Sequence, residues 1–207
     1  MPTSLDSQVR YLVQTKLHPP HISREIVARP RLLTLFDPEA ELTLVIAAAG
    51  YGKTTLLCDW LSALHRPAAW LTLDGDDDNL VQFLTYLTLA MRRPFPGFGD
   101  ALFDQLAAPT LPPAPLLAAM LHRAFESIDQ PCILVLDDYH LIRRPEIHAV
   151  LTELLRNPPA PLHLVIAARR QAFRAALNRR FLTPKRIQDC QRYYNTLFNT
   201  LTARDIE

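Results

Sequence analysis

A short glycine-containing segment, AAAGYGKT over residues 47–54, constrains this chain more than any other stretch of its 207 residues. It joins an apolar run over 42–49, which predicts a strand, to an amphipathic run over 54–64, which predicts a helix. At such a junction, unhindered residues let several backbone N–H groups converge on one anion, beside the partial positive charge of the helix N-terminus. The segment therefore predicts a phosphate-binding loop, in which Ala47 replaces the first glycine of the usual GxxxxGKS/T pattern.

The side chains of this loop favour a nucleoside triphosphate with a magnesium ion as the ligand. A lysine at position 53 brings a positive charge to the β- and γ-phosphates, and the next hydroxyl is placed to reach Mg²⁺. Glycine at positions 50 and 52 leaves the backbone free to curl around the phosphates. The nucleotide-binding residues that we expect in the loop are Ala49, Gly50, Tyr51, Gly52, Lys53, Thr54 and Thr55.

A second motif is an apolar run that ends in two carboxylates, CILVLDD over residues 132–138. It predicts a buried strand with both carboxylates at its end. We expect Asp137 to orient the magnesium ion opposite Thr54, because a nucleotide-bound Mg²⁺ is held by carboxylates and waters. Asp138, one residue further, points in another direction and is expected to polarise an attacking water.

A basic pair follows another apolar run, LHLVIAA over residues 162–168. The carboxyl end of a parallel strand faces the ligand in open α/β sheets, so a guanidinium at Arg169 would sense the γ-phosphate. Arg170 competes for this role, and a solvated basic pair is the simpler alternative. With Arg169 as the sensor, the expected catalytic residues are Lys53, Asp138 and Arg169, and the expected metal-binding residues are Thr54 and Asp137.

The order of apolar and amphipathic segments predicts the fold class. The apolar runs are continuous rather than alternating, which is typical of strands buried on both faces of a parallel sheet. They alternate with helical patterns, as in an α/β fold with right-handed crossovers. The expected strands cover 42–49, 68–74, 132–138 and 162–168, and the expected helices cover 54–64, 79–93, 114–128 and 146–156. Residues 94–115 contain six prolines and are expected to form a surface excursion, with at most a short helix near 100–107.

Composition excludes several classes of protein. The formal net charge is +1, which argues against a strongly basic nucleic-acid binder. The longest apolar runs fall well short of the roughly 20 residues that cross a bilayer. The N-terminus has no signal-peptide pattern, and Cys58, Cys132 and Cys190 form no CxxC pair. A reduced, cytoplasmic location without membrane contact fits these features best.

Other polar residues are given structural interpretations. The segment over Asp74–Asn79 imitates the start of a calcium loop but has Asn79 at the sixth position, where glycine is required. We interpret it as the polar end of a strand, followed by an N-cap for the helix over 79–93. The seven histidines show no metal-ligand spacing, and His140 and His148 are interpreted as loop and helix-face residues.

Charge is distributed unevenly along the chain. Residues 1–168 have a net charge of −5, whereas residues 169–207 have a net charge of +6 and few apolar runs. We therefore expect the segment over 170–207 to be a basic tail outside the core, either helical or disordered. The alternative role for this tail, nonspecific binding of nucleic acid, is the less favoured one.

Taken together, the motifs resemble the STAND-class P-loop ATPase domain of MalT-like, LuxR-type transcriptional regulators, over about residues 13–169. The segments that carry the resemblance appear in the family's order: TKL (15–17), VARPRL (27–32), AAAGYGKTTLLCDW (47–60), AAWLTLD (68–74), FLTYL (83–87), LVLDDYHLI (134–142) and LHLVIAAR (162–169). The resemblance implies a P-loop NTPase three-layer sandwich of the additional-strand type, with the Arg169 strand between the Lys53 loop's strand and the Asp137 strand. It also implies that Val27 and Arg29 lie near the adenine.

The resemblance further implies an ATP-driven switch, in which ADP holds a resting form and ATP favours self-association. It ends at Arg169, so the sheet is expected to be incomplete at the C-terminus. The expected organisation is an N-terminal segment over 1–32, a P-loop ATPase core over 33–169 and the basic tail over 170–207. The final LTARDIE is similar to the opening of a LuxR-type helix-turn-helix, and a truncated, frameshifted or rearranged gene is the simplest account. DNA binding is not expected of this chain alone.

Three functional hypotheses follow. The first is an ATP-binding, weakly hydrolysing switch module with ATP or ADP and Mg²⁺ as ligands. The second is a P-loop phosphotransferase, for which the aspartates at 74–78 would have to bind a small substrate. The third is an inactive nucleotide-binding remnant. Adjacent carboxylates at 137 and 138, with Arg169 on a separate strand, suit activation of water and therefore favour the first hypothesis.

Overall fold

The computed structural model describes residues 14–21 and 29–169, and a four-stranded parallel sheet forms its centre. The strands lie in the order β1-β4-β3-β2. Their bounds are Leu42–Ala47 for β1, Ala68–Thr72 for β2, Cys132–Asp137 for β3 and Leu162–Arg169 for β4. The continuous apolar runs therefore predicted the strands and their parallel direction correctly. Strand β4 lies between β1 and β3, which confirms the additional-strand arrangement.

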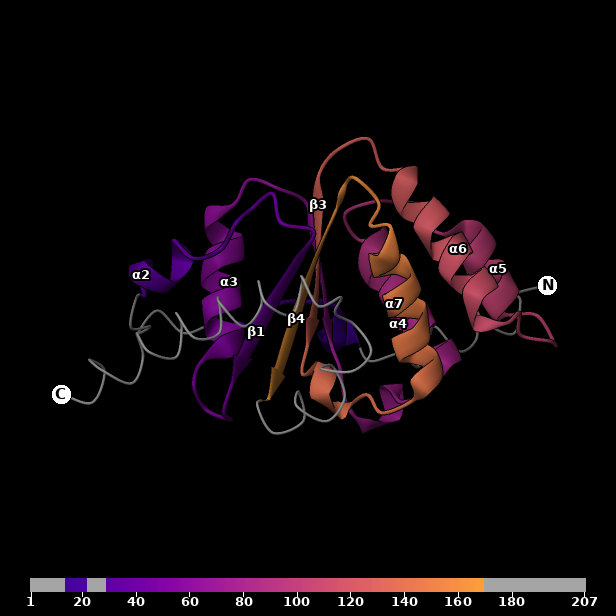
Figure 1. Ribbon diagram of the computed structural model, residues 1–207, viewed down its shortest axis with the longest axis horizontal. Coiled ribbons are helices and arrows are strands. Elements are labelled where there is room, and N and C mark those ends of the chain that lie inside the picture. The colour runs from indigo at the N-terminus through magenta and orange to yellow at the C-terminus, as the bar shows by residue number, and fades with distance from the viewer. Residues whose placement is uncertain (1–13, 22–28, 170–207) are drawn as a thin grey trace.

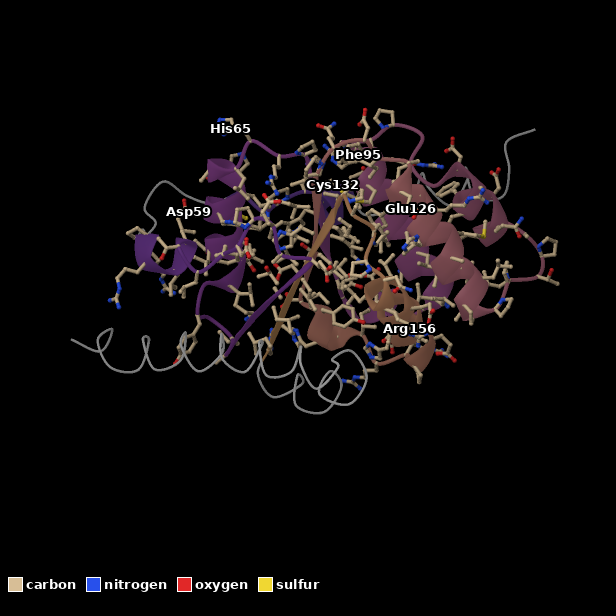
Figure 2. The ribbon with its side chains drawn as sticks, turned by 45° about the horizontal axis from the view of Figure 1, so that its top comes forward. Asp59, His65, Phe95, Glu126, Cys132 and Arg156 are labelled. Carbon is tan, nitrogen blue, oxygen red and sulfur yellow. The ribbon has the colours of Figure 1, made fainter. Side chains whose placement is uncertain are left out.

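Helices cover both faces of the sheet and make a three-layer sandwich (Figure 1). Helices α2 (Pro30–Leu33) and α3 (Lys53–Ala63) lie on one side. The other side carries α4 (Leu80–Arg92), α5 (Asp100–Leu106), α6 (Ala114–Glu126) and α7 (Pro145–Arg156). Short 3-10 turns are η1 (Gln14–Leu17), η2 (Gly75–Asp77) and η3 (Tyr139–Leu141). Figure 2 shows the same layers with Asp59 on the α3 side, and Glu126 and Arg156 on the opposite side.

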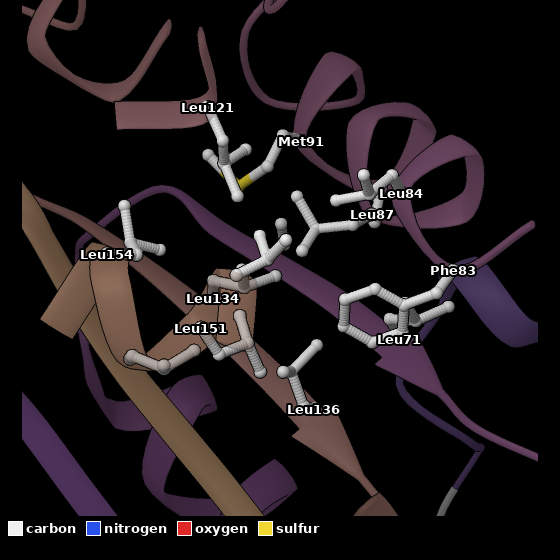
Figure 3. Packing of buried hydrophobic residues seen from close by; sticks show 14 of the residues in the cluster. Leu71, Phe83, Leu84, Leu87, Met91, Leu121, Leu134, Leu136, Leu151 and Leu154 are labelled. Atoms are coloured by element: carbon white, nitrogen blue, oxygen red, sulfur yellow. The ribbon is translucent and has the colours of Figure 1, made fainter. Parts of the chain in front are cut away.

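The sheet divides the core into two hydrophobic clusters because successive strand residues face opposite sides. Leu134 and Leu136 of β3 belong to the larger cluster under α4 to α7, where Figure 3 shows them packed among leucines of α4 and α7. Ile133 and Val135 belong to the smaller cluster against Trp60 of α3. Each face of β3 is therefore apolar, which explains the unbroken apolar run in the sequence.

Two differences from the expected elements concern β1 and the proline-rich segment. Strand β1 ends at Ala47 rather than at residue 49, because the chain turns there into the glycine-containing loop. The proline-rich segment over 94–115 is more than a surface excursion. Phe98 and Leu102 are buried in the larger cluster, so apolar side chains spaced between the prolines anchor the segment to the core.

Several expectations concern parts of the chain outside the described residues. These parts include Val27, Arg170 and the expected basic tail over 170–207, so the proposed boundaries at 32 and 169 remain predictions. Within the described ranges, no helix has both the length and the apolar character needed to span a bilayer.

Buried His163 on β4 predicts a loss of stability in mild acid. Its Nε2 lies 2.8 Å from the Thr43 hydroxyl of β1. Burial lowers the pKa of His163 from 6.5 to about 4, the charge of Arg66 adds to this, and Asp37 and Glu39 oppose it. Between pH 6.5 and 4, His163 is therefore protonated in the unfolded chain but neutral in the folded chain. About 3 kcal/mol of stability that is present above pH 6.5 is lost as pH falls toward 4.

Urea unfolding of the parent and of His163→Gln between pH 7.5 and 4.5 measures this effect. We expect the free energy of unfolding of the variant to fall less steeply over that range, whatever its absolute stability. Equal slopes in the two proteins would contradict the assignment to His163.

Candidate functional site

The loop between β1 and α3 has the backbone conformation of a phosphate-binding loop. Gly50 and Gly52 have φ angles of 80° and 72°, in the left-handed region that side chains disfavour. A Cβ at Gly50 would meet no atom within 4 Å, so the conformation itself, and not crowding, requires glycine. Gly52 is the N-cap of α3 and offers no side-chain cap, so the first N–H groups of α3 remain available to an anion.

Lys53 folds back over this loop. Its Nζ donates to the carbonyls of Ala47, at 3.4 Å, and Ala48, at 3.2 Å, and the residue is 9% exposed. Both acceptors are neutral and both hydrogen bonds are long. Phosphate oxygens would give shorter, charge-assisted hydrogen bonds to the same ammonium group, so Lys53 is poised to exchange the carbonyls for an anion.

Arg29 reaches the loop from the segment that precedes α2. Its Nη1 donates to the carbonyl of Tyr51 at 3.1 Å and is the atom that a Cβ on Gly52 would approach, at 4.0 Å. The Tyr51 side chain is itself 58% exposed. Arg29 therefore contacts the phosphate-binding loop, and its expected place near the adenine remains a prediction.

The two motifs meet through Thr54 and Asp137. The Thr54 hydroxyl, in the first turn of α3, donates to Oδ2 of Asp137 at the end of β3, at 2.7 Å. Asp137 is buried, and burial raises its pKa; the hydrogen bond from Thr54 opposes this rise, and the charge of Asp138 adds to it. A hydroxyl and a carboxylate are both hard oxygen ligands, so this pair fits the magnesium ion that accompanies a nucleotide.

Asp138 leaves the strand in a different direction. Its φ of 55° makes it the single non-glycine residue with a positive φ among residues 14–21 and 29–169. Aspartate tolerates this left-handed region better than most residues. The turn directs the Asp138 N–H to Oδ1 of Asp137, at 2.9 Å. The expected division of roles between the two carboxylates stays a prediction.

His140 is the site residue that the sequence interpretation missed. It lies in η3, as a loop residue should, but its side chain is only 8% exposed and its Nδ1 lies 3.6 Å from Oδ1 of Asp138. Burial lowers the pKa of His140, Asp138 opposes this, and the charges of Arg169 and Lys53 lower it further. A neutral ring thus lies among the catalytic candidates. The sequence signal that could have indicated this role is the position of His140, two residues after the paired carboxylates.

Arg169 ends β4 directly beside the phosphate-binding loop. In the parallel pairing of β1 and β4, its Cα is opposite that of Ala47, the last residue of β1. The side chain is exposed and close enough to His140 to influence its pKa. The carboxyl ends of β1, β3 and β4 therefore gather Lys53, Thr54, Asp137, Asp138, His140 and Arg169 at one edge of the sheet.

The acidic segment after β2 has structural partners. Lys16 of η1 contacts Asp74 at 2.6 Å and Asp77 at 2.8 Å. Asn79 accepts from the backbone of the first turn of α4, at 3.1 Å, so the expected N-cap is confirmed. Among the described residues, no group of three or more His, Cys, Asp or Glu is arranged to hold a metal ion.

Comparisons with known proteins identify the family. A family model described as an AAA ATPase domain matches residues 29–167. The HTH-type transcriptional regulator MalT of Yersinia pestis (strain Pestoides F) is 35% identical over 163 residues, which cover 76% of this chain and 18% of the regulator. MalT of Yersinia enterocolitica is 34% identical over the same lengths. The chain thus spans about a fifth of the length of these curated relatives.

A solved structure of Thermomonospora curvata EccC (ATPases 2 and 3), in complex with a signal sequence peptide, is 20% identical, with a TM-score of 0.38. The match covers 74% of this chain and 29% of that one. The family model spans well over half of the chain, and the relatives carry the regulator name that the motifs pointed to. The chain belongs to the AAA ATPase domain family and is related in sequence to the MalT transcriptional regulators.

Proposed function

We propose that this chain is the ATP-binding, weakly hydrolysing switch module of a MalT-like regulator. The observation that carries the proposal is the 2.7 Å contact between Thr54 and Asp137, which come from motifs 83 residues apart in the sequence. Their contact at the carboxyl edge of the sheet supports a shared ligand, which a magnesium nucleotide fits best.

The residues around this contact suit MgATP. Thr54 and Asp137 would hold the ion, Lys53 would bind the β- and γ-phosphates, and the N-terminus of α3 would add its partial positive charge. The bound ion would neutralise part of the charge on the phosphate oxygens. Backbone N–H groups over 49–55 complete the cradle, because the left-handed glycines turn them toward one point.

The chemistry proposed for the chain is hydrolysis. Asp138 would accept a hydrogen bond from the attacking water and so orient it toward the γ-phosphate. His140 lies beside the Asp138 carboxylate and, as a neutral ring, would limit the directions in which that carboxylate can turn. Arg169 would place its guanidinium near the γ-phosphate from the neighbouring strand. Slow turnover suits a switch, because the ATP state must persist long enough to act.

Other parts of the proposal follow from the relation to MalT. Val27 and Arg29 would lie near the adenine, and the ATP-bound form would self-associate. A cytoplasmic location fits the unpaired thiols of Cys58 and Cys132. Residues 1–32 would lead into the nucleotide site, and residues 170–207 would lie outside the ATPase core. No DNA binding is proposed for the described residues.

The phosphotransferase alternative loses support in the structure. It needs the aspartates at 74–78 to bind a substrate, yet Lys16 engages Asp74 and Asp77. Asp78 accepts from the backbone of residues 143 and 144. Three of the four carboxylates are therefore used to hold the fold, and a water-activating Asp138 needs no second substrate.

Lys53→Ala tests nucleotide binding. Loss of a charge-assisted phosphate contact costs about 1.5–3 kcal/mol, so the Kd for MgATP should rise about 10- to 150-fold by calorimetry. Arg156→Ala is the matched control. Arg156 is also a cation, but it is exposed at the C-terminal end of α7 and is not one of the expected nucleotide-binding residues. Equal affinity of the parent and Lys53→Ala would refute the proposal. No binding by the parent would also refute it, whereas binding without turnover would favour an inactive nucleotide-binding remnant.

A further inference from the structure

The loop between β3 and α7 carries both Asp138 and His140, so its position decides where these two side chains lie. Tyr139 anchors the first half of the loop. Its ring is buried, and its hydroxyl oxygen lies 2.7 Å from Nδ1 of His148 in α7. This contact holds the residue next to Asp138. The second half of the loop, from residue 141 to 144, is held by other contacts.

Asp78 holds that second half. One oxygen of its carboxylate, Oδ1, accepts from the backbone N–H of Arg143 at 2.8 Å and of Arg144 at 2.7 Å. Nε of Arg144 also donates to the carbonyl of Asp78, at 3.2 Å. Asp78 belongs to the loop after β2, and β2 pairs with β3 in the sheet. The loop after β2 and the loop after β3 are thus joined by three hydrogen bonds.

Asp78 contacts the residues at which α7 begins. The N-cap of α7, Arg144, makes no side-chain capping hydrogen bond, and Pro145 at the first helical position has no N–H. The Asp78 carboxylate accepts from the two N–H groups just before the helix and places a negative charge near the positive end of the helix. Asp78 therefore fixes the point at which the catalytic loop becomes α7.

We propose that Asp78 is a positioning residue for ATP hydrolysis: it holds the loop over 138–144 so that Asp138 and His140 stay aimed at the nucleotide. This inference rests on the hydrolytic function proposed above. Asp78 itself touches the backbone of the loop and not the reacting atoms. Its loss should therefore change the rate of the chemical step more than the binding of MgATP, because Lys53 and Thr54 lie in the first turn of α3 and not in this loop.

The test compares turnover and binding in four proteins: the parent, Asp78→Ala, Asp78→Asn and Asp76→Ala. Misplacement of a catalytic group by about 1 Å costs on the order of 100-fold in rate, so Asp78→Ala should lower kcat about 10- to 100-fold and leave the Kd for MgATP within about twofold. Asp78→Asn keeps an acceptor oxygen at the same place and should restore most of the rate. Asp76, exposed in the same loop, is the matched control and should behave like the parent.

Hydrogen exchange of the peptide over 139–144 gives a second readout in the same proteins. We expect faster exchange in Asp78→Ala and near-parental exchange in Asp78→Asn. If Asp78→Ala does not fold, Asp78→Glu replaces it, because the longer side chain keeps the charge but shifts the acceptor oxygen.

The outcomes separate this inference from the proposed function. Parental turnover in the disruptive variant, or a rise in Kd equal to the fall in kcat, would overturn the positioning role while hydrolysis by the parent stands. Failure of Asp78→Asn to restore the rate would also overturn it. Absence of turnover in the parent would overturn hydrolysis first, and with it any positioning role of Asp78.

Discussion

Asp138→Asn is expected to bind MgATP as the parent does and to lose most of its turnover. Positioned proton transfer contributes about 10²- to 10⁴-fold to rates, and an amide can neither take a proton nor hold the charge that orients the water. Asparagine also tolerates the left-handed backbone that Asp138 adopts, with its φ of 55°, so the loop should keep its shape. Single-turnover release of phosphate, with the protein in excess over ATP, measures the effect directly.

Asp137→Asn is the matched control, because it makes the same chemical change one residue earlier. Asp137 receives the Thr54 hydroxyl and is placed for the metal ion, so this variant should lose the magnesium dependence of ATP binding. Loss of turnover in Asp138→Asn, together with loss of magnesium-dependent binding in Asp137→Asn, would support a water-orienting role for Asp138 and a metal-binding role for Asp137. Turnover at the parental rate in Asp138→Asn would show that the water is activated by another group.

The strands were predictable because each is apolar on both faces. Residues such as Leu134 and Val135 belong to different hydrophobic clusters, and that arrangement leaves an unbroken apolar run in the sequence. The phosphate-binding loop was predictable because few residues other than glycine take φ angles of 80° and 72°. The order of the strands came from the family resemblance, since apolar runs alone do not determine which strands are neighbours.

The parts that were not predicted leave no clear pattern in the sequence. The 3-10 turns η1, η2 and η3 contain only three or four residues each, too few to show a helical period. His140 gains its place in the site from a turn that buries it beside Asp138. The buried Phe98 escaped notice because the prolines around it suggested a loop.

The acidic run after β2 is the clearest case of such a limit. In the sequence it is interpreted as the polar end of a strand followed by an N-cap, and nothing nearby balances its charge. In the structure its neutralising cation is Lys16, 61 residues away from Asp77. The same run also supplies the acceptor for the loop that carries Asp138. The acidic run therefore holds η1 through Lys16 and holds the loop before α7 through Asp78.

Lys16→Met is expected to destabilise the chain by about 3–5 kcal/mol, because removing one member of a buried ion pair leaves the other charge uncompensated. Nζ of Lys16 lies 2.8 Å from Asp77 and 4.8 Å from the centre of the Tyr86 ring. Side-chain exposure is 10% for Lys16 and 0% for Asp77. Burial alone would lower the pKa of Lys16, but hydrogen bonds and charges from Asp74 and Asp77 outweigh it and raise this pKa.

Two further variants separate the buried charge from other effects of the change. Methionine keeps most of the lysine stem, so Lys16→Met with Asp77→Asn should recover part of the loss, because no isolated carboxylate then stays buried. Arg156→Met is the surface control: Arg156 pairs with Glu153 at 64% side-chain exposure, and exposed pairs contribute only about 0–1 kcal/mol. Urea unfolding of the parent and of these three variants at pH 7 gives the free energies. A loss for Lys16→Met no larger than that for Arg156→Met would mean that Asp77 relaxes into contact with water, and that η1 is held to β2 by apolar packing alone.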